Sequence, residues 1–352
     1  MKYIKKILVS IITVSVLFTM CACASKESKK TEEITQSDSL EKGNLTVVGF
    51  SQLGAESDWR SANTQSMKET FTEENGYRLI FEDGQQKQAN QIMAIRKFIQ
   101  QEVDYIVLAP VTEKGWDTVL REAKDAGIPV IIVDRMVDVA DDSLYECWIG
   151  SDFKLEGKKV CTWISEYCKK KAINQNKLKI VDLQGNLGAT AQIGRTRGLA
   201  DSARAFGWRV NEYVPADFTQ TKGREVMRIL LKKYKDINVV YCENDNEALG
   251  AIEAIEEAGR KAGSNINAGE IMVVSFDGIN EKARSYVLED KISCIAECNP
   301  LHGPRVKEII EKLEKGQKPP KLSYVSEEIY AHDNVIETIR VDNIEYPVTV
   351  LK

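Results

Sequence analysis

Side chains with planar, forked hydrogen-bonding groups stand just after most of the strand-like runs in this sequence. Together with one aromatic residue, the set is Glu56, Trp59, Arg60, Asp134, Arg135, Arg195, Asn244, Asp277 and Glu297. Arginine, aspartate and asparagine form paired hydrogen bonds within a plane. Adjacent hydroxyl groups of a sugar offer paired donors and acceptors at a matching spacing, and the apolar face of a sugar ring can lie on an indole. These residue types therefore suit the binding of a sugar.

Local structural roles are the alternatives at the same positions. In "ESDWR", Ser57 or Asp58 can cap a helix, with Trp59 packed locally and Arg60 solvated. The dipeptide at 134–135 can equally be a turn that contains an ion pair. From these short stretches alone, both readings stay open.

Two further stretches place polar groups near helix starts. "QGNLGATAQIGRTRG" resembles a phosphate loop because Gly185 and Gly188 lie between a strand and a helix. It lacks both G-x-G-x-x-G and G-x-x-x-x-G-K-[ST], so turn glycines are favoured over a nucleotide site. Arg195, in the following helix, points either to a cleft or to solvent. In "CENDNEALGAI", Asn244 ends a strand, and the next residue or the one after it, at 245–246, is the expected helix cap.

Signatures of catalysis or metal binding are missing from the sequence. It contains no G-x-S-x-G or H-E-x-x-H motif, and its only histidines are His302 and His332. The carboxylates of Asp134, Asp277 and Glu297 are more easily used as hydrogen-bond acceptors than as a catalytic pair. We therefore expect a binding protein without cofactor or metal. A sugar-modifying enzyme on the same fold is the disfavoured alternative.

Apolar, β-branched runs alternate with amphipathic stretches along the chain. Strands are expected at 45–50, 77–83, 105–110, 129–135, 178–185, 208–214, 237–244, 271–278 and 292–297, and helices at 61–74, 88–101, 113–125, 191–206 and 246–258. Continuously apolar strands indicate parallel sheets that are covered by helices on both faces. The alternation runs once before about Gly150 and once after it, which predicts an α/β protein of two doubly wound, Rossmann-like lobes. Ligands bind beyond the carboxyl ends of such strands, so a cleft between the lobes is expected to gather the polar residues.

Composition is that of a globular protein. The chain has 352 residues, of which 43% are hydrophobic and 29% charged, so it can bury a substantial core. The net charge of -5 and the scattered lysines give no reason to expect a nucleic-acid partner.

The first residues are typical of an exported protein. Three lysines precede an uncharged apolar run from Ile7 to Ala24, which indicates a signal peptide at 1–22. Cys23 follows a small residue in "MCAC" and is the expected lipidation site, with Cys21 as a competing candidate. A retained transmembrane helix is the alternative, because the run is only slightly shorter than a membrane span. The polar segment 23–44 is expected to be a flexible tether.

The remaining cysteines are expected to be free thiols. They are Cys147, Cys161, Cys168, Cys242, Cys294 and Cys298. Export permits disulfides. However, Cys161 and Cys168 lie two turns apart on a probable helix, about 10 Å, which is beyond disulfide reach.

Several motifs in fixed order give the chain a family resemblance. "VGFSQLGAESDWR", "VDR", "GATAQIGRTRG", "ADFTQTKGREVM", "CENDNEALGAI", "SFDG" and "AECNP" resemble type I periplasmic sugar-binding proteins of ABC transporters, in the ribose/galactose branch and most like galactofuranose-binding proteins. The resemblance runs from about Leu45 to Ile339. It implies sugar contacts from Trp59, Arg60, Asp134, Arg135, Arg195, Asn244 and Asp277, with Phe218, Glu56 and Glu297 as weaker candidates. Glu297 departs from the ribose binders, which tend to have glutamine there.

The resemblance also implies how the chain is divided and what it does. Three crossings, near Gly150, Glu297 and Ser323, would join an N-terminal lobe of 45–150 plus 298–323 to a C-terminal lobe of 151–297 plus 324–352. Such a hinge closes around its ligand. The implied function is a monomeric, lipid-anchored lipoprotein on the extracytoplasmic face of the cell membrane, which presents a monosaccharide to an ABC permease. The alternative is a sensor that acts on a membrane histidine kinase. A DNA-binding regulator with the same core is disfavoured, because an export signal stands where its DNA-binding domain would be.

Overall fold

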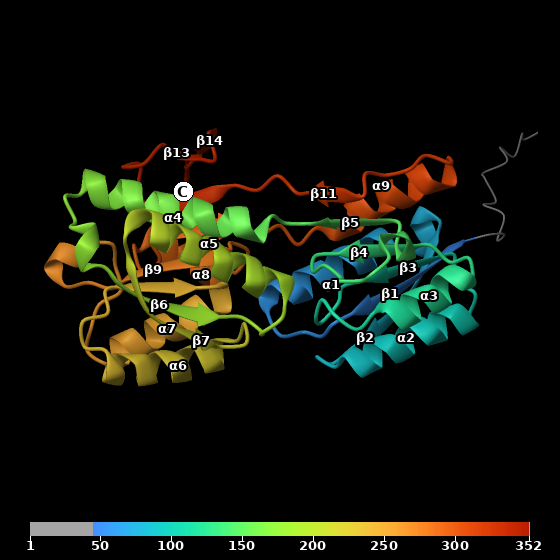
Figure 1. The fold of residues 1–352 in the computed structure, drawn as a ribbon, viewed down its shortest axis with the longest axis horizontal. Coiled ribbons are helices and arrows are strands. Elements are labelled where there is room, and N and C mark those ends of the chain that lie inside the picture. The colour runs from blue at the N-terminus through green and yellow to red at the C-terminus, as the bar shows by residue number, and fades with distance from the viewer. Residues whose placement is uncertain (1–44, 352) are drawn as a thin grey trace, which may run out of the picture. The chain divides into compact units, whose positions relative to one another are not determined.

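The computed structural model describes residues 45–351, which contain one parallel and one mainly parallel sheet flanked by helices (Figure 1). The first sheet has the strand order β11-β5-β4-β3-β1-β2, and its pairs are parallel. Its strands are β1 (Thr46–Gln52), β2 (Tyr77–Asp83), β3 (Tyr105–Leu108), β4 (Val130–Val133), β5 (Cys147–Gly150) and β11 (Leu322–Tyr324). Helices α1 (Asp58–Thr70) and α9 (His302–Glu314) pack on one face, and α2 (Gln88–Gln100) and α3 (Asp117–Asp125) pack on the other.

The second sheet repeats this plan. Its order is β15-β12-β10-β9-β8-β6-β7, so β6 to β10 occupy the same relative places as β1 to β5. Its strands are β6 (Lys179–Gln184), β7 (Arg209–Pro215), β8 (Val239–Cys242), β9 (Met272–Asp277), β10 (Cys294–Glu297), β12 (Ile329–Ala331) and β15 (Thr349–Val350). Strand β12 is antiparallel to β10.

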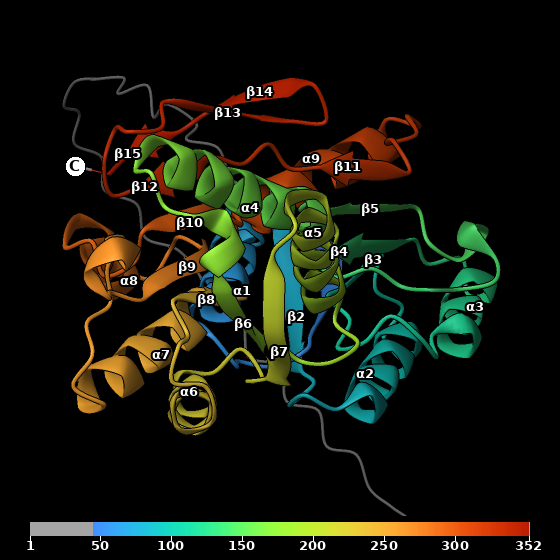
Figure 2. The ribbon, with the colours of Figure 1, turned by 60° about the vertical axis from the view of Figure 1, so that its left-hand side comes forward.

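Helices cover both faces of the second sheet as well. Helices α4 (Phe153–Lys170) and α5 (Thr190–Phe206) lie side by side on one face, with α6 (Gln220–Lys233), α7 (Asp245–Glu257) and α8 (Glu281–Leu288) on the other (Figure 2). A hairpin of β13 (Thr338–Val341) and β14 (Ile344–Pro347) contacts α4. Short 3₁₀ helices occur at Glu73–Asn75, Asp142–Leu144, Gln175–Lys177 and Ile266–Ala268.

The expected strands and helices are present, with ends shifted by a few residues, and the predicted fold class is confirmed. The chain passes between the two sheets at 151–152, 298–301 and 325–328, which we call the crossing segments. Among residues 45–351, no helix has the length and apolarity needed to cross a membrane. The six cysteines from Cys147 to Cys298 are free and buried. The expected signal peptide, the tether and Cys23 lie outside the described residues.

Candidate functional site

A small cavity lies beyond the carboxyl ends of strands from both sheets. It is lined by Glu56, Ser57, Trp59, Arg60, Asp134, Arg135, Phe153, Ala191, Arg195, Phe218, Asn244, Asp277 and Cys298. The volume of the cavity is about 30 Å³, which is room for about two water molecules. The lining side chains meet closely in this arrangement, so a molecule the size of a monosaccharide enters only when they move apart.

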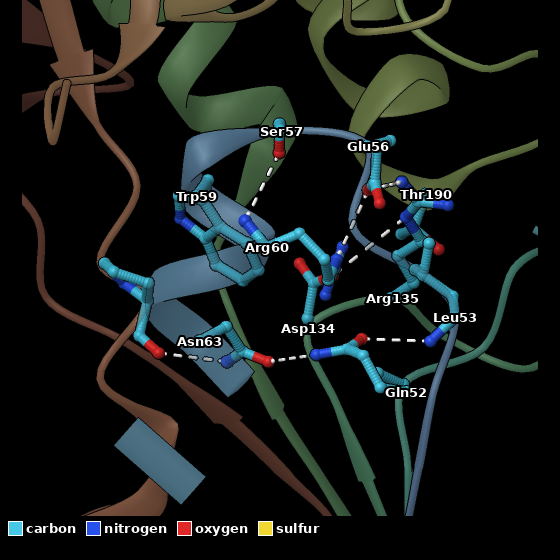
Figure 3. Close-up of polar contacts among 12 residues, drawn as sticks. Gln52, Leu53, Glu56, Ser57, Trp59, Arg60, Asn63, Asp134, Arg135 and Thr190 are labelled. Carbon is cyan, nitrogen blue, oxygen red and sulfur yellow. Dashed lines mark hydrogen bonds and ion pairs between the residues drawn. The ribbon is translucent and has the colours of Figure 1, made fainter. Parts of the chain in front are cut away.

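Arg60 is held in the cavity wall by two carboxylates. Ser57 caps α1, and its hydroxyl accepts a hydrogen bond from the Arg60 backbone N–H at 3.2 Å. The guanidinium of Arg60 contacts two carboxylates. Its Nη2 donates to Oδ2 of Asp134 at 2.6 Å, and its Nε donates to Oε1 of Glu56 at 3.3 Å (Figure 3). Arg60 is only 3% exposed. The expected helix cap is therefore correct, but Arg60 is not solvated.

Arg135 shares one of these carboxylates. Its Nη2 donates to the same Oε1 atom of Glu56 at 3.2 Å, and its Nη1 donates to the carbonyl of Val111 at 3.1 Å. Glu56 thus holds two guanidinium groups beside each other (Figure 3). Nη1 of Arg60 and Nε of Arg135 are buried and have no hydrogen-bond partner. These two donors are available to a ligand in the cavity.

Two arginines, Arg60 and Arg135, are paired with two carboxylates, Asp134 and Glu56, in this part of the cavity wall. Burial would raise the pKa of Asp134, but Arg60 and Arg135 outweigh burial and bring that pKa below its usual value. Burial and the neighbouring Arg60 lower the pKa of Arg135 to about 10. Both arginines and Asp134 are therefore charged at neutral pH, which makes their hydrogen bonds charge-assisted.

Aromatic rings supply the apolar part of the lining. Trp59 is 5% exposed, and its Nε1 donates to the carbonyl of Cys298 at 2.6 Å, which fixes the indole against the second crossing segment. The Arg60 guanidinium lies over this indole, 4.7 Å from the ring centre. Phe153 and Phe218, from the second sheet's side, complete the lining.

Arg195, on α5, faces the cavity and not solvent. Its Nε donates to Oε2 of Glu156 at 2.8 Å, and its Nη2 donates to Oδ1 of Asp277 at 3.2 Å. Its Nη1 donates to the carbonyl of Glu243. Burial would lower the pKa of Arg195, but Glu156 and Asp277 raise it well above its usual value. The second sheet thus contributes a buried arginine between carboxylates, as the first sheet does.

Asn244 holds an aromatic residue of the lining in place. It caps α7 itself, accepting from the backbone N–H of Glu247 at 2.8 Å, so the cap expected at 245–246 is wrong by one or two residues. Its Nδ2 donates to the carbonyl of Phe218 at 3.0 Å. One amide N–H and one oxygen lone pair of Asn244 remain for a ligand.

The backbone is strained at three positions around the cavity. Asp134, Phe218 and Asp277 have φ angles of 61°, 60° and 89°, in the left-handed region. This conformation costs residues other than glycine about 1 to 3 kcal/mol each. Such strain concentrates where side chains must be aimed at a ligand.

Among the site residues expected within residues 45–351, only Glu297 does not line the cavity. Its Oε1 accepts from Nδ2 of Asn299 at 3.2 Å and its Oε2 accepts from the Glu328 backbone N–H at 2.9 Å. Neighbouring residues of an extended chain point to opposite sides, and the next residue, Cys298, takes the place in the cavity wall. Glu297 thus lies beside the second crossing segment, and its assignment as a weaker candidate near the cleft or hinge stays a prediction.

The cavity lining and its support also include residues that were not in the sequence-based set, among them Phe153, Glu156 and Cys298. Phe153 and Glu156 lie on α4 and do not stand at the end of a strand, whereas Cys298 directly follows β10 but has a thiol and not a forked polar group. Glu156 did carry a signal, because a carboxylate lies in the buried stripe of α4 with Phe153 and Val160. A charged residue in such a stripe needs a buried partner.

Comparison with known proteins places this site in a family. Residues 48–302 match the family described as periplasmic binding protein domain. The galactofuranose-binding protein YtfQ of Escherichia coli is 40% identical over 299 residues, covering 83% of this chain and 90% of its own.

Two solved structures have a similar fold and sequence. A Mycobacterium smegmatis protein in complex with β-D-fucofuranose is 39% identical, has a TM-score of 0.76 and covers 82% of this chain and 92% of its own. The binding-protein component of the arabinose ABC transporter from Shewanella sp. ANA-3, bound to L-arabinofuranose, is 38% identical, with a TM-score of 0.75 and coverage of 82% and 93%. These relatives are binding proteins and not enzymes. The chain belongs to the periplasmic binding proteins, in the sugar-binding group that contains the ribose and galactofuranose binders.

Proposed function

We propose that this protein binds a monosaccharide in its furanose ring form and delivers it to an ABC permease. The observation that carries the proposal is the cavity itself, in which buried arginines from both sheets stand between carboxylates and next to Trp59. The relatives at 38 to 40% identity are named for galactofuranose or were solved with furanose sugars. We assign the sugar contacts to Glu56, Trp59, Arg60, Asp134, Arg135, Arg195, Asn244 and Asp277.

The remaining parts of the proposal concern anchoring and closure. Lipidation at Cys23 would hold the protein at the extracytoplasmic face of the membrane, through a tether at 23–44. The N-terminal lobe, 45–150 plus 298–323, and the C-terminal lobe, 151–297 plus 324–352, would close on the sugar by bending at the crossing segments. The protein would act as a monomer beside its permease.

Ring form can be tested with two deoxysugars. 5-Deoxy-D-galactose lacks the oxygen that closes a pyranose ring, and 4-deoxy-D-galactose lacks the oxygen that closes a furanose ring. We expect the full chain to bind D-galactose, L-arabinose and the 5-deoxy sugar in calorimetry, and to reject the 4-deoxy sugar. Binding of the 4-deoxy sugar alone would contradict the furanose assignment, and no binding across the panel would contradict the sugar class.

A further inference from the structure

The carboxylate of Glu327 joins the three crossing segments. Its Oε1 accepts from the hydroxyl of Ser151 at 2.6 Å and from the backbone N–H of Asn299 at 2.8 Å. Ser151, Asn299 and Glu327 each lie on a different crossing segment. Because a hinge motion changes the backbone torsions of these segments, it cannot leave all of these contacts in place.

A second carboxylate lies against this junction. One carboxylate oxygen each from Glu156 and Glu327, and the sulfur of Cys298, lie within 4.8 Å of one another. Oε1 of Glu156 is buried and has no hydrogen-bond partner, while Oε2 accepts from Arg195. Two charged carboxylates this close repel each other, and a single shared proton converts the repulsion into a hydrogen bond.

The charged groups around Glu156 and Glu327 do not replace the shared proton. From α4, Nζ of Lys159 donates to the backbone carbonyl of Glu327 and not to its carboxylate. From α5, Arg195 contacts the carboxylate of Glu156 but not that of Glu327. The other charged or titratable groups near the pair are Asp152 at the start of α4, Asp277 at the end of β9, Glu297 at the end of β10, Cys298 and Arg305 on α9. Three of these five are carboxylates, and the one cation among them, Arg305, donates to Asn299 and Leu301 and not to the pair.

The electrostatics agree with the geometry. Burial, followed by the charge of Glu156, raises the pKa of Glu327 to about 9. Burial also raises the pKa of Glu156, although Arg195 opposes this. Glu327 therefore holds a proton at neutral pH in the arrangement seen here, while Arg195 favours the charged form of Glu156.

We propose that Glu156 and Glu327 share one proton across the hinge, and that closure of the protein on its sugar takes up this proton. The inference rests on the sugar-binding function proposed above. The link to the sugar site is direct, because Glu156 holds Arg195 and Arg195 reaches Asp277 in the cavity wall. Glu156 and Glu327 are thus positioning residues, which act on the sugar through Arg195 and through the crossing segments.

The open and closed states bind different numbers of protons, and this difference sets how sugar affinity changes with pH. In the open protein, separated and hydrated carboxyl groups have pKa values near 4.3 and carry no proton at neutral pH. The closed state binds one proton more, so sugar binding strengthens at low pH and weakens as the pH rises from about 5 to about 9. For one proton, the dissociation constant rises by at most tenfold for each pH unit.

The test is calorimetric titration of the full chain with L-arabinose and D-galactose at pH 7, in two buffers that differ in ionisation enthalpy. The difference in measured heat gives the number of protons taken up. We expect about 0.5 to 1 proton for each sugar bound. In Glu327→Gln, whose amide replaces the protonated acid, we expect the uptake to disappear and the rise of the dissociation constant between pH 6 and 8 to flatten. Glu328→Gln is the matched control, since Glu328 is the exposed neighbour on the same segment and should leave the proton uptake unchanged.

The possible outcomes separate a failure of the shared proton from a failure of the sugar-binding function. Sugar binding with no proton uptake, or with an uptake that Glu327→Gln leaves intact, overturns the shared proton and leaves the sugar-binding function standing. Loss of affinity after addition of EDTA also overturns it, because a metal ion would then link Glu156, Cys298 and Glu327. If no sugar binds, the proposed function and the sugar-linked proton uptake both fail, which distinguishes this outcome from the others, in which only the shared proton fails.

Discussion

At the scale of single residues, the cavity is built on arginines whose positions carboxylates fix in advance. Arg60, Arg135 and Arg195 are each at most 3% exposed, and each contacts a buried carboxylate. A guanidinium held in this way loses little side-chain entropy when it binds a sugar hydroxyl. The carboxylates thus contribute to affinity even where they do not touch the ligand.

Removing one arginine should affect both binding and folding. Arg195→Ala deletes the donors to the cavity and leaves Glu156 and Asp277 buried without their cation. We expect sugar affinity to fall at least 100-fold, and the free energy of unfolding to fall by about 3 to 5 kcal/mol, as for other broken buried pairs. Calorimetry and urea unfolding measure the two effects.

The matched control is an arginine of an exposed ion pair. Arg96 bonds Glu122 on the surface of the first lobe, with half of its side chain exposed. Arg96→Ala should leave affinity unchanged and stability nearly so, since exposed ion pairs contribute little. Equal losses in the two variants would show that the pairing of Arg195 has no special importance.

The two glycines of the loop before α5 should respond differently to alanine. A Cβ atom on Gly185 would lie 1.9 Å from the ring of Phe218, so alanine there must push this ring of the cavity wall away. We expect Gly185→Ala to weaken sugar binding about tenfold and to destabilise the protein by about 1 to 3 kcal/mol. Gly188 has a φ of +85° with no atom near its missing Cβ. Gly188→Ala should cost about 1 kcal/mol of stability and leave affinity unchanged. Equal affinities of the two variants would show that the position of the Phe218 ring in the cavity wall does not affect sugar binding.

At the scale of elements, a hydrogen-bonded chain ties α1 to α9. Nε2 of Gln52 donates to Oδ1 of Asn63 (Figure 3). This bond turns the Asn63 amide nitrogen toward the carbonyl of Pro300 and the ring of His302. Nδ1 of His302 therefore accepts from Asn63, and the proton of the neutral ring sits on Nε2. The start of α9 and the second crossing segment are fixed by a histidine that must stay neutral.

This histidine should make the protein sensitive to acid. Burial lowers the pKa of His302 to about 4, against about 6.5 in an unfolded chain. Between these values the unfolded state binds the proton and the folded state does not. We therefore expect the free energy of unfolding to fall as the pH drops from about 6.5 to 4, by at most about 1.4 kcal/mol per unit from this group. His302→Asn, which keeps an acceptor for Asn63, should have a flatter pH profile in urea unfolding. An identical slope in both proteins would rule out His302 as the cause.

The sequence predicted the elements around β1 to β4 and β6 to β10, because their apolar runs are continuous and their helices periodic. It did not predict β5 or β11 to β15. These strands are short, and one such as Leu322–Tyr324 is also partly exposed and stabilised by pairing with distant β5. The site was predictable where residues follow strands, as Asp134 and Asp277 do. Glu327 is tied to the site only through contacts between the crossing segments, which local patterns do not encode, whereas Glu156 carried a local signal in the buried stripe of α4.

At the scale of the whole molecule, polar contacts between the two sheets' domains hold the cavity closed. On one side, the backbone N–H of Met136 donates to the hydroxyl of Thr190 at 2.8 Å. On the other, Oδ2 of Asp58, at the start of α1, accepts from Nδ2 of Asn246 at 3.2 Å and from Nδ2 of Asn280. These residues do not line the cavity. Closure and sugar contact are therefore separable by mutation.

Asp58→Ala tests that separation. The variant keeps every side chain of the cavity wall but loses the acceptor that bridges to α7 and α8, so the closed state should open more often. We expect the sugar to dissociate about three- to tenfold faster, in line with the loss of one or two modest hydrogen bonds, while the association rate stays the same. Stopped-flow tryptophan fluorescence with L-arabinose or D-galactose measures both rates. Glu69→Ala, on the exposed side of the same helix, is the control and should change neither rate. A slower association with an unchanged dissociation rate would mean that Asp58 guides the sugar into the cleft and does not hold the closed state.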